Sequence, residues 1–169
     1  GLLGAAGVFG ALNMVADGFA AAIRTGAAFE AKITAVGAVT KASRADMAAL
    51  EKAARDMGTA TEFSATQSAG ALYSLGTAGF SAKQSIEALP GVIDLATAAQ
   101  IDLESATDIA TSGLNAMGLK ISDLAHFNDV LAGVAVRSNA GITDMGYALK
   151  YVAPIASQAG YSIEQVGAA

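Results

Sequence analysis

The sequence contains one histidine, His126, and this residue is the best candidate for acid–base or metal chemistry. It lies in the segment DLAHFNDVL, where Asp123 is three residues earlier and Asn128 and Asp129 follow. Positions three apart share one face of a helix, so Asp123 and His126 could act together. A metal centre would need more ligands, and the chain has no second histidine and no cysteine. We therefore interpret His126 as a surface or cap-proximal residue and predict no metal site.

Three other patterns could support chemistry. Asp94, Asp102, Glu104 and Asp108 form an acidic stretch, which we interpret as a solvated face that compensates helix dipoles. The many serines have capping or helix-surface explanations, so no Ser-His-acid triad is expected. The segments GTAG and GLNAMG lack the Lys-Ser/Thr pair and the preceding strand of a phosphate loop. The sequence thus predicts no catalytic residue, no enzyme activity and no cofactor.

The composition indicates what kind of scaffold surrounds these residues. The 169-residue chain is 53% hydrophobic but only 6% aromatic, and it contains 19 glycines among many alanines. Alanine is the best helix former, and small side chains let helices approach closely. The net charge of −5 argues against specific nucleic-acid binding, which usually needs a basic stripe. We predict an all-α fold, a multi-helix bundle of short helices.

The first segment, GLLGAAGVFGALNMVADGFAAAIR, is the most apolar part of the chain, and its first charged residue is Asp17. Gly4, Gly7 and Gly10 recur on a three-residue spacing and predict a helix contact, because small residues let backbones touch. A membrane-spanning helix needs about 20 apolar residues, and Asn13 and Asp17 interrupt this one. We favour a buried or self-associating helix over residues 1–28, while a membrane-inserting segment and a signal peptide stay open as alternatives.

From Phe29 onward, capping residues divide the chain at regular intervals. Ser43, Ser64 and Ser81 each precede an Asp or Gln by three residues, which is typical of a capping box, and Gly58 is expected to end the first of these helices. A new first turn can begin at Pro90. We expect helices near residues 44–57, 65–77, 82–100, 103–117, 123–138 and 143–158, with Ser122 and Thr143 at the starts of the last two and a bend at Pro154.

One sequence pattern occurs twice, as GTAGFSAKQS at 76–85 and as SQAGYSIEQV at 157–166. The segment AMGLKIS at 116–122 is a looser copy of it. Glycine adopts the left-handed conformation that ends a helix, the next apolar residue packs back, and Ser with Gln caps the following helix. The spacing between copies is irregular, so we predict tight αα-corners rather than a solenoid. The corner residues are Gly79, Phe80, Ser81, Gln84, Gly118, Ser122, Gly160, Tyr161, Ser162 and Gln165.

The order of these segments resembles the core region of phage tail tape measure proteins. The resemblance runs from about Phe29 to the end, through the series Gly-x-x-Thr-x-Phe-Ser, Ala-Gly-Phe-Ser, Ala-Leu-Pro, Asp-Leu, Asp-Val-Leu and Ala-Gly-Tyr-Ser. The Gly/Ala-rich segment before it is also similar to what the family carries. On this basis we divide the chain into a helical segment, 1–28, and a core domain, 29–169, and expect both ends to be cut from a longer protein.

The resemblance implies a long helical virion protein in the lumen of the tail tube, present in several copies. It implies a role in setting tail length during assembly and release at genome ejection. The implied partners are other copies of itself, tail tube and tail tip or baseplate hub proteins, tail assembly chaperones and, for some members, the host membrane. Because the corners fold this stretch back on itself, we expect a compact assembly or anchor domain rather than the measuring rod.

Three alternatives remain open from the sequence. The segment could be a membrane-inserting module for genome translocation, or it could belong to a tail-like particle such as a bacteriocin or a gene transfer agent. It could also be an adaptor bundle unrelated to phage.

Overall fold

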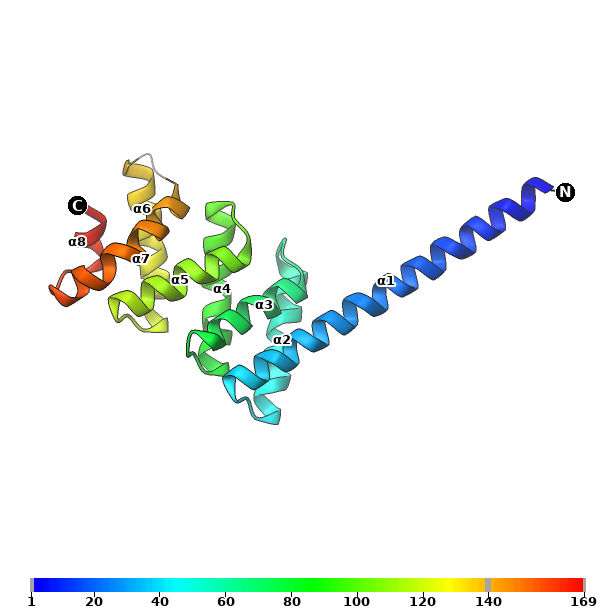
Figure 1. The fold of residues 1–169 in the computed structure, drawn as a ribbon, viewed down its shortest axis with the longest axis horizontal. Coiled ribbons are helices and arrows are strands. Elements are labelled where there is room, and N and C mark those ends of the chain that lie inside the picture. Colours follow the sequence, from blue (N-terminus) through cyan, green and yellow to red (C-terminus); the bar gives the residue numbers. More distant parts are fainter. Residues whose placement is uncertain (1, 139–140, 169) are drawn as a thin grey trace.

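The computed structural model describes residues 2–138 and 141–168, with side chains for 20–137 and 141–168. All regular elements in these ranges are helical, which confirms the predicted all-α fold (Figure 1). The helices are α1 (Leu2–Thr40), α2 (Arg44–Ala60), α3 (Ala65–Thr77), α4 (Ala82–Ala99), α5 (Leu103–Met117), the 3-10 turn η1 (Ile121–Asp123), α6 (Leu124–Ser138), α7 (Ile142–Gln158) and α8 (Ile163–Ala168).

Helix α1 is attached to the bundle only by its C-terminal third and projects away from it, as Figure 1 shows. Phe29, Ile33 and Val36 are spaced to share one helix face, and all three are buried. They lie against α3 and α2. Residues 20–28 are all exposed, so the first buried side chain of the described part is Phe29. The side chains around Gly4, Gly7 and Gly10 lie outside the described residues, and the contact expected there stays a prediction.

The other helices pack in sequence order into one continuous apolar core that runs from Phe29 to Ile163. Helices α1, α2 and α3 form one end, α3, α4 and α5 the middle, and α5, α6, α7 and α8 the other end. Glycine allows the closest approaches: a Cβ on Gly113 would lie 2.2 Å from the Cζ of the fully buried Phe127. The small-residue composition therefore sets how tightly the helices pack.

The corners have the predicted backbone conformation. Gly79, Gly118 and Gly160 have φ values of 99°, 65° and 82°. In each case the following N–H donates to the carbonyl five residues earlier, as with Phe80 and Leu75 at 3.2 Å. This is the Schellman arrangement, which satisfies carbonyls at the end of a helix. Lys41 and Gln100, both with φ of 53°, end α1 and α4 in the same way without glycine, and the sequence did not predict them.

The capping boxes also form. Ser81 N–H donates to Gln84 Oε1 at 3.0 Å, and Gln84 N–H donates back to Ser81 Oγ at 3.4 Å. The same reciprocal pair joins Ser162 and Gln165 at the start of α8. Ser43 and Ser64 cap α2 and α3 with Asp46 and Gln67. The starts of these four helices are therefore satisfied locally, without help from the rest of the bundle.

Two of the predicted helix starts were wrong. Ser122 caps nothing, because it lies inside the 3-10 turn η1, and the Lys120 N–H is bonded by Asp123 at 2.9 Å instead. The start of α7 is Gly141 rather than Thr143, so Thr143 lies in the first turn. In both cases an extended residue just upstream takes the N-cap position.

Three further expectations need correction. Gly58 does not end α2, which continues to Ala60, and its missing Cβ instead lets the α3 backbone approach, since a Cβ there would lie 2.5 Å from Ala65 N. Pro90 starts no new turn, because α4 runs through it unbroken. Tyr161, which we expected to pack back on the preceding helix, is 56% exposed and does not join the core, whereas Ile163 is buried. The bend at Pro154 stays a prediction.

Candidate functional site

The side-chain partner of His126 comes from another helix, while Asp129 lines the same hollow as His126. The His126 Nε2 contacts Oε1 of Glu164, which α8 brings across from 38 residues later in the chain. Asp123 instead accepts the Lys120 N–H at the start of η1. The side chains of His126 and Glu164 are both more than half exposed, so their contact contributes little to stability. The sequence could not have found Glu164 as the partner, because no motif links the two helices.

Glu164 is the most perturbed carboxyl group of the described chain. Hydrogen bonds from the Ser162 hydroxyl and the backbone, with His126 adding to them, lower its pKa from 4.5 to about 2. All these partners stabilise the carboxylate form. A carboxyl group held ionised in this way accepts hydrogen bonds but cannot serve as a general acid near neutral pH.

A shallow hollow beside this pair is lined by both α6 and α8. Its walls include Val130 and Gly133 of α6 and Gly167 of α8, with His126 and Glu164 at the rim. Gly167 allows α8 to approach, since a Cβ there would lie 2.5 Å from a methyl group of Val134. Among the described residues, no group of three or more His, Asp or Glu side chains is placed to hold a metal ion.

Two residues of the acidic stretch, Asp102 and Asp108, have structural roles. Asp102 is the N-cap of α5, and its Oδ1 accepts the Ser105 N–H at 2.8 Å. Hydrogen bonds from Ser105 lower the Asp102 pKa. Asp108 forms an ion pair with Lys150 of α7. The polar roles of Asp102 and Asp108 are therefore explained by a cap and by a surface ion pair, while Glu104 lines a hollow together with Asp108.

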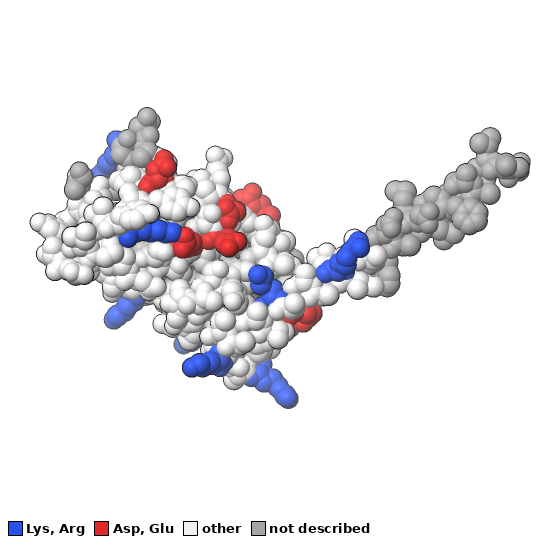
Figure 2. Space-filling view, in the orientation of Figure 1, with Lys and Arg blue, Asp and Glu red and all other residues white. Residues whose placement is uncertain are grey.

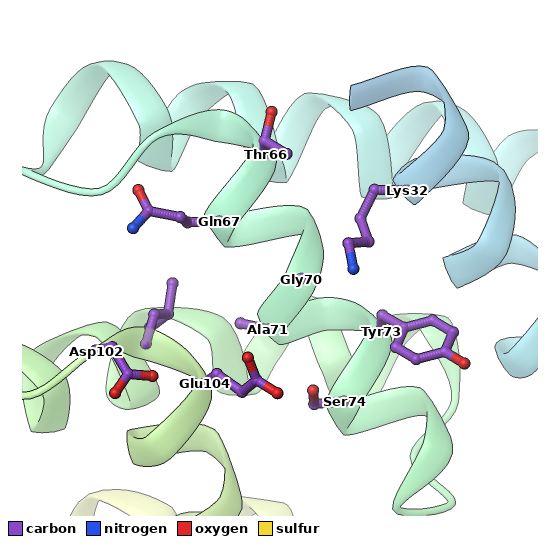
Figure 3. Close-up of a pocket in the computed structure, with 10 residues that line it drawn as sticks. Lys32, Thr66, Gln67, Gly70, Ala71, Tyr73, Ser74, Asp102 and Glu104 are labelled. Carbon is purple, nitrogen blue, oxygen red and sulfur yellow. The ribbon is translucent and has the colours of Figure 1, made fainter. Parts of the chain in front are cut away.

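The hollow shown in Figure 3 lies between α1, α3 and α5 and has a volume of about 440 Å³. Lys32 approaches from α1 and Glu104 from α5, with Tyr73 of α3 at one end. The Lys32 Nζ lies 5.6 Å from the centroid of the Tyr73 ring, a favourable cation–π distance. Asp102 on the wall is already used as a cap. The hollow presents charge of both signs and no nucleophile with an activating base.

Figure 2 shows that acidic side chains gather over the middle of the visible face, while basic side chains are scattered over it. No basic stripe of the kind that tracks a nucleic-acid backbone crosses this face. Helices within the described part of the chain lack the combined length and apolar character needed to cross a bilayer. The membrane alternative concerns residues 1–28, most of whose side chains are not described.

Comparisons with known proteins identify the family of the chain. The family model for phage-related minor tail proteins matches residues 51–169. The tape measure protein of Pneumococcus phage Dp-1 is 36% identical over 163 residues, covering 96% of this chain and 14% of that protein. The probable tape measure protein of Escherichia phage P2 is 32% identical over 166 residues, covering 98% of this chain and 20% of that protein. No solved structure matches the chain.

The chain therefore spans between about one seventh and one fifth of the length of these two relatives. Both relatives align over nearly the whole bundle and α1, so the similarity covers the fold described above rather than one corner motif. The family is that of a structural tail component of the virion. The chain belongs to the phage-related minor tail proteins and is a tape measure protein region.

Proposed function

We propose that this region is a compact assembly or anchor domain of a tape measure protein that sets tail length, lies in the lumen of the tail tube and leaves at genome ejection. The observation that carries the proposal is the geometry of the chain. One projecting helix, α1, is joined to a bundle that is folded back by five left-handed corners among the described residues. A rod that measures length needs extended helix, and a bundle needs closed corners. The bundle is thus suited to hold an end rather than to span a distance.

The proposal assigns no catalytic role to any side chain of the region. Its partners would be other copies of the protein, the tail tube, the tail tip or baseplate hub, and tail assembly chaperones. The corners support such a role because they fix the bundle surface that partners would contact, and each corner is held by its own backbone and cap hydrogen bonds.

The test is to loosen a corner in the complete phage protein. Gly79→Val combined with Ser81→Ala forces a β-branched residue into positive φ and removes the α4 cap. We expect few or no finished tails, and unchanged tail length in those that form, measured by electron microscopy of lysates. His126→Ala is the matched surface control and should assemble normally.

Two results would contradict the proposal. Tails that are abundant but shorter would assign the measuring role to this bundle. Normal assembly of His126→Ala particles that fail to infect would reopen a chemical role for the surroundings of His126.

A second candidate function is membrane insertion by the N-terminal segment. Residues 20–28 favour it, because this apolar stretch is exposed throughout, with Ile23 57% exposed and Arg24 its one charge. The chain should then release dye from liposomes, and a chain starting at Phe29 should not. If residues 1–28 serve only in self-association, their fragment should oligomerise or need detergent while liposomes stay sealed. Equal solubility and a monomeric state for fragments with and without residues 1–28 would contradict self-association, and sealed liposomes would contradict membrane insertion.

A further inference from the structure

Helix α1 turns into α2 through a left-handed corner that is built without glycine. Lys41 has a φ of 53° there, in a region that lowers the population of an ordinary residue roughly five- to thirtyfold. The Ala42 N–H donates to the Gly37 carbonyl at 2.9 Å, and Ser43 then caps α2 together with Asp46. The three linking residues, Lys-Ala-Ser, include neither glycine nor proline, and all three are tolerated inside a helix. The corner is therefore strained in a segment that has no helix breaker.

The other left-handed corners are less suited to opening. Gly79, Gly118 and Gly160 adopt positive φ without a penalty, and glycine would weaken a continuous helix. Gln100 is the other left-handed corner without glycine among the described residues. Joining α4 to α5 there would pull α5 away from α3 and α4, which form the middle of the bundle. Since α1 lies at one end and is docked only by its last third, Lys41 is the corner that opens at the lowest cost (Figure 1).

The docked part of α1 is held mainly by apolar contacts. Phe29, Ile33 and Val36 are buried against α3 and α2. The guanidinium carbon of Arg55, on α2, lies 4.3 Å from the centroid of the Phe29 ring. A terminal nitrogen of the same guanidinium lies 3.3 Å from Glu30 Oε1, in an exposed ion pair that contributes little. The release of α1 would therefore break one small apolar interface and no buried polar network among these residues.

We propose that Lys41 is a hinge at which α1 leaves α3 and joins α2 in one continuous helix. Straightening moves Lys41 into the helical region and turns Ser43 from an N-cap into a residue of the helix interior. A few residues that absorb a large φ/ψ change are typical of hinges. Glu30 and Arg55, which now touch, would be separated by 25 residues, or about 38 Å, of helix. The inference rests on this corner and is independent of the role in the tail.

The closed form is the major one in the isolated chain, because straightening exposes Phe29, Ile33 and Val36. Full burial of a side chain of this size favours the closed form by about tenfold or more. Relief of the strain at Lys41 favours the open form, and loss of the Ser43 cap opposes it by a similar factor. The test must therefore detect a small population in exchange with the closed form.

Thiol labelling of single-cysteine variants detects this population, because the native chain has no cysteine. Val36→Cys places a thiol on the face that straightening releases, and Val92→Cys on α4 is the matched control. Both positions are 0% exposed. Val36→Cys should react with an aromatic disulfide at least about tenfold faster than Val92→Cys, whose exposure requires the core to unfold. Equal rates would show that α1 is released only by unfolding of the whole bundle and would overturn the proposal.

Two cap variants distinguish straightening from detachment of α1 with the corner intact. In the Val36→Cys chain, Ser43→Ala should raise the labelling rate about fivefold, because Ser43 caps α2 only in the closed form. Ser64→Ala is the matched control: it removes the same kind of cap from α3, which both forms keep, and should leave the rate unchanged. A rate that does not respond to Ser43→Ala would show that α1 detaches without joining α2.

Lys41→Gly tests the hinge residue itself. Glycine removes the strain from the closed form and weakens the straight helix, so labelling of Val36→Cys should slow by about tenfold. Lys41→Ala keeps both the strain and the helix propensity and should change the rate by less than about twofold. The proposal fails if Lys41→Gly leaves the rate of Val36→Cys unchanged, or if it slows Val92→Cys by the same factor.

Discussion

Gly79 offers the sharpest test of how the corners stabilise this bundle. A Cβ at Gly79 would meet no atom within 4 Å, so Gly79→Ala adds backbone strain without any clash. Its φ of 99° lies beyond the usual left-handed value near 57°, where an ordinary residue loses roughly 1–2 kcal/mol. Alanine also restricts the unfolded chain, which returns about 0.4–1 kcal/mol. We expect a net loss of about 1 kcal/mol.

Gly70 supplies the matched control, because the same substitution there should have the opposite sign. It lies inside α3, and a Cβ there would also meet nothing within 4 Å. Gly70→Ala should stabilise the bundle by about 1 kcal/mol through helix propensity. The two variants should thus differ by about 2 kcal/mol, or roughly 4–8 °C in Tm for a domain of this size.

The assay is urea and thermal unfolding followed by far-UV circular dichroism, with the two alanine variants and the native chain compared at one protein concentration. If Gly79→Ala proved as stable as Gly70→Ala, positive φ at the corner would not be a strained requirement, and the explanation of the repeated Ala-Gly-aromatic-Ser motif would fail. Gly79→Asn should lie between the native chain and Gly79→Ala, because asparagine tolerates the left-handed region better than most residues.

Three further predictions concern caps, acid and packing. Ser81→Ala should lower the urea midpoint by the equivalent of about 1 kcal/mol, while Ser122→Ala should leave it nearly unchanged, because only Ser81 caps a helix. The lowered pKa of Glu164 adds stability that is present above pH 4.5, its usual pKa, and is lost as the pH falls toward about 2. Glu164→Gln should therefore flatten the curve of Tm against pH between these two values. Above pH 4.5 the slope of the curve should not change. His126→Ala should change the curve less, since His126 lowers the pKa of Glu164 by less than the Ser162 hydroxyl and the backbone do. Gly113→Ala should destabilise by about 1–3 kcal/mol, because its Cβ would lie 2.2 Å from the rigid buried ring of Phe127, and a stable Gly113→Ala variant would refute the packing described here.

Local signals predicted most of the fold. The bounds of α3 and α5 coincide with the ranges expected from the sequence, because a side-chain cap precedes each and glycine lies at or near each end. The left-handed residues Lys41 and Gln100 were missed, since no residue type marks them and tertiary packing decides where α1 and α4 end. The Ser122 prediction was wrong for the opposite reason. Serine favours a capping position, but Asp123 accepts the N–H of Lys120, so Lys120 takes the N-cap position and Ser122 lies inside η1.

The contacts between helices could not be predicted from the sequence. The partner of His126 comes from α8, and the neighbour of Gly113 from α6, so both depend on the completed bundle. The two copies of the repeated corner also differ in their surroundings. Phe80 packs against the core, while Tyr161 is exposed. Identical local motifs thus have different roles, because the helices around them bury only one of the two aromatic rings.

Each residue of the projecting helix adds far more to the length of the protein than each residue of the bundle does. Helix α1, with 39 residues at about 1.5 Å each, is roughly 58 Å long. The residues from Arg44 to Ala168 would reach about 190 Å as one helix, but a folded unit of that size is only about 35 Å across. If the proposed role is correct, a residue inserted into α1 lengthens the protein by about 1.5 Å, whereas a residue inserted into a corner adds almost nothing. Tail length would then be proportional to the number of residues in the protein only after the residues of the bundle are subtracted from that number.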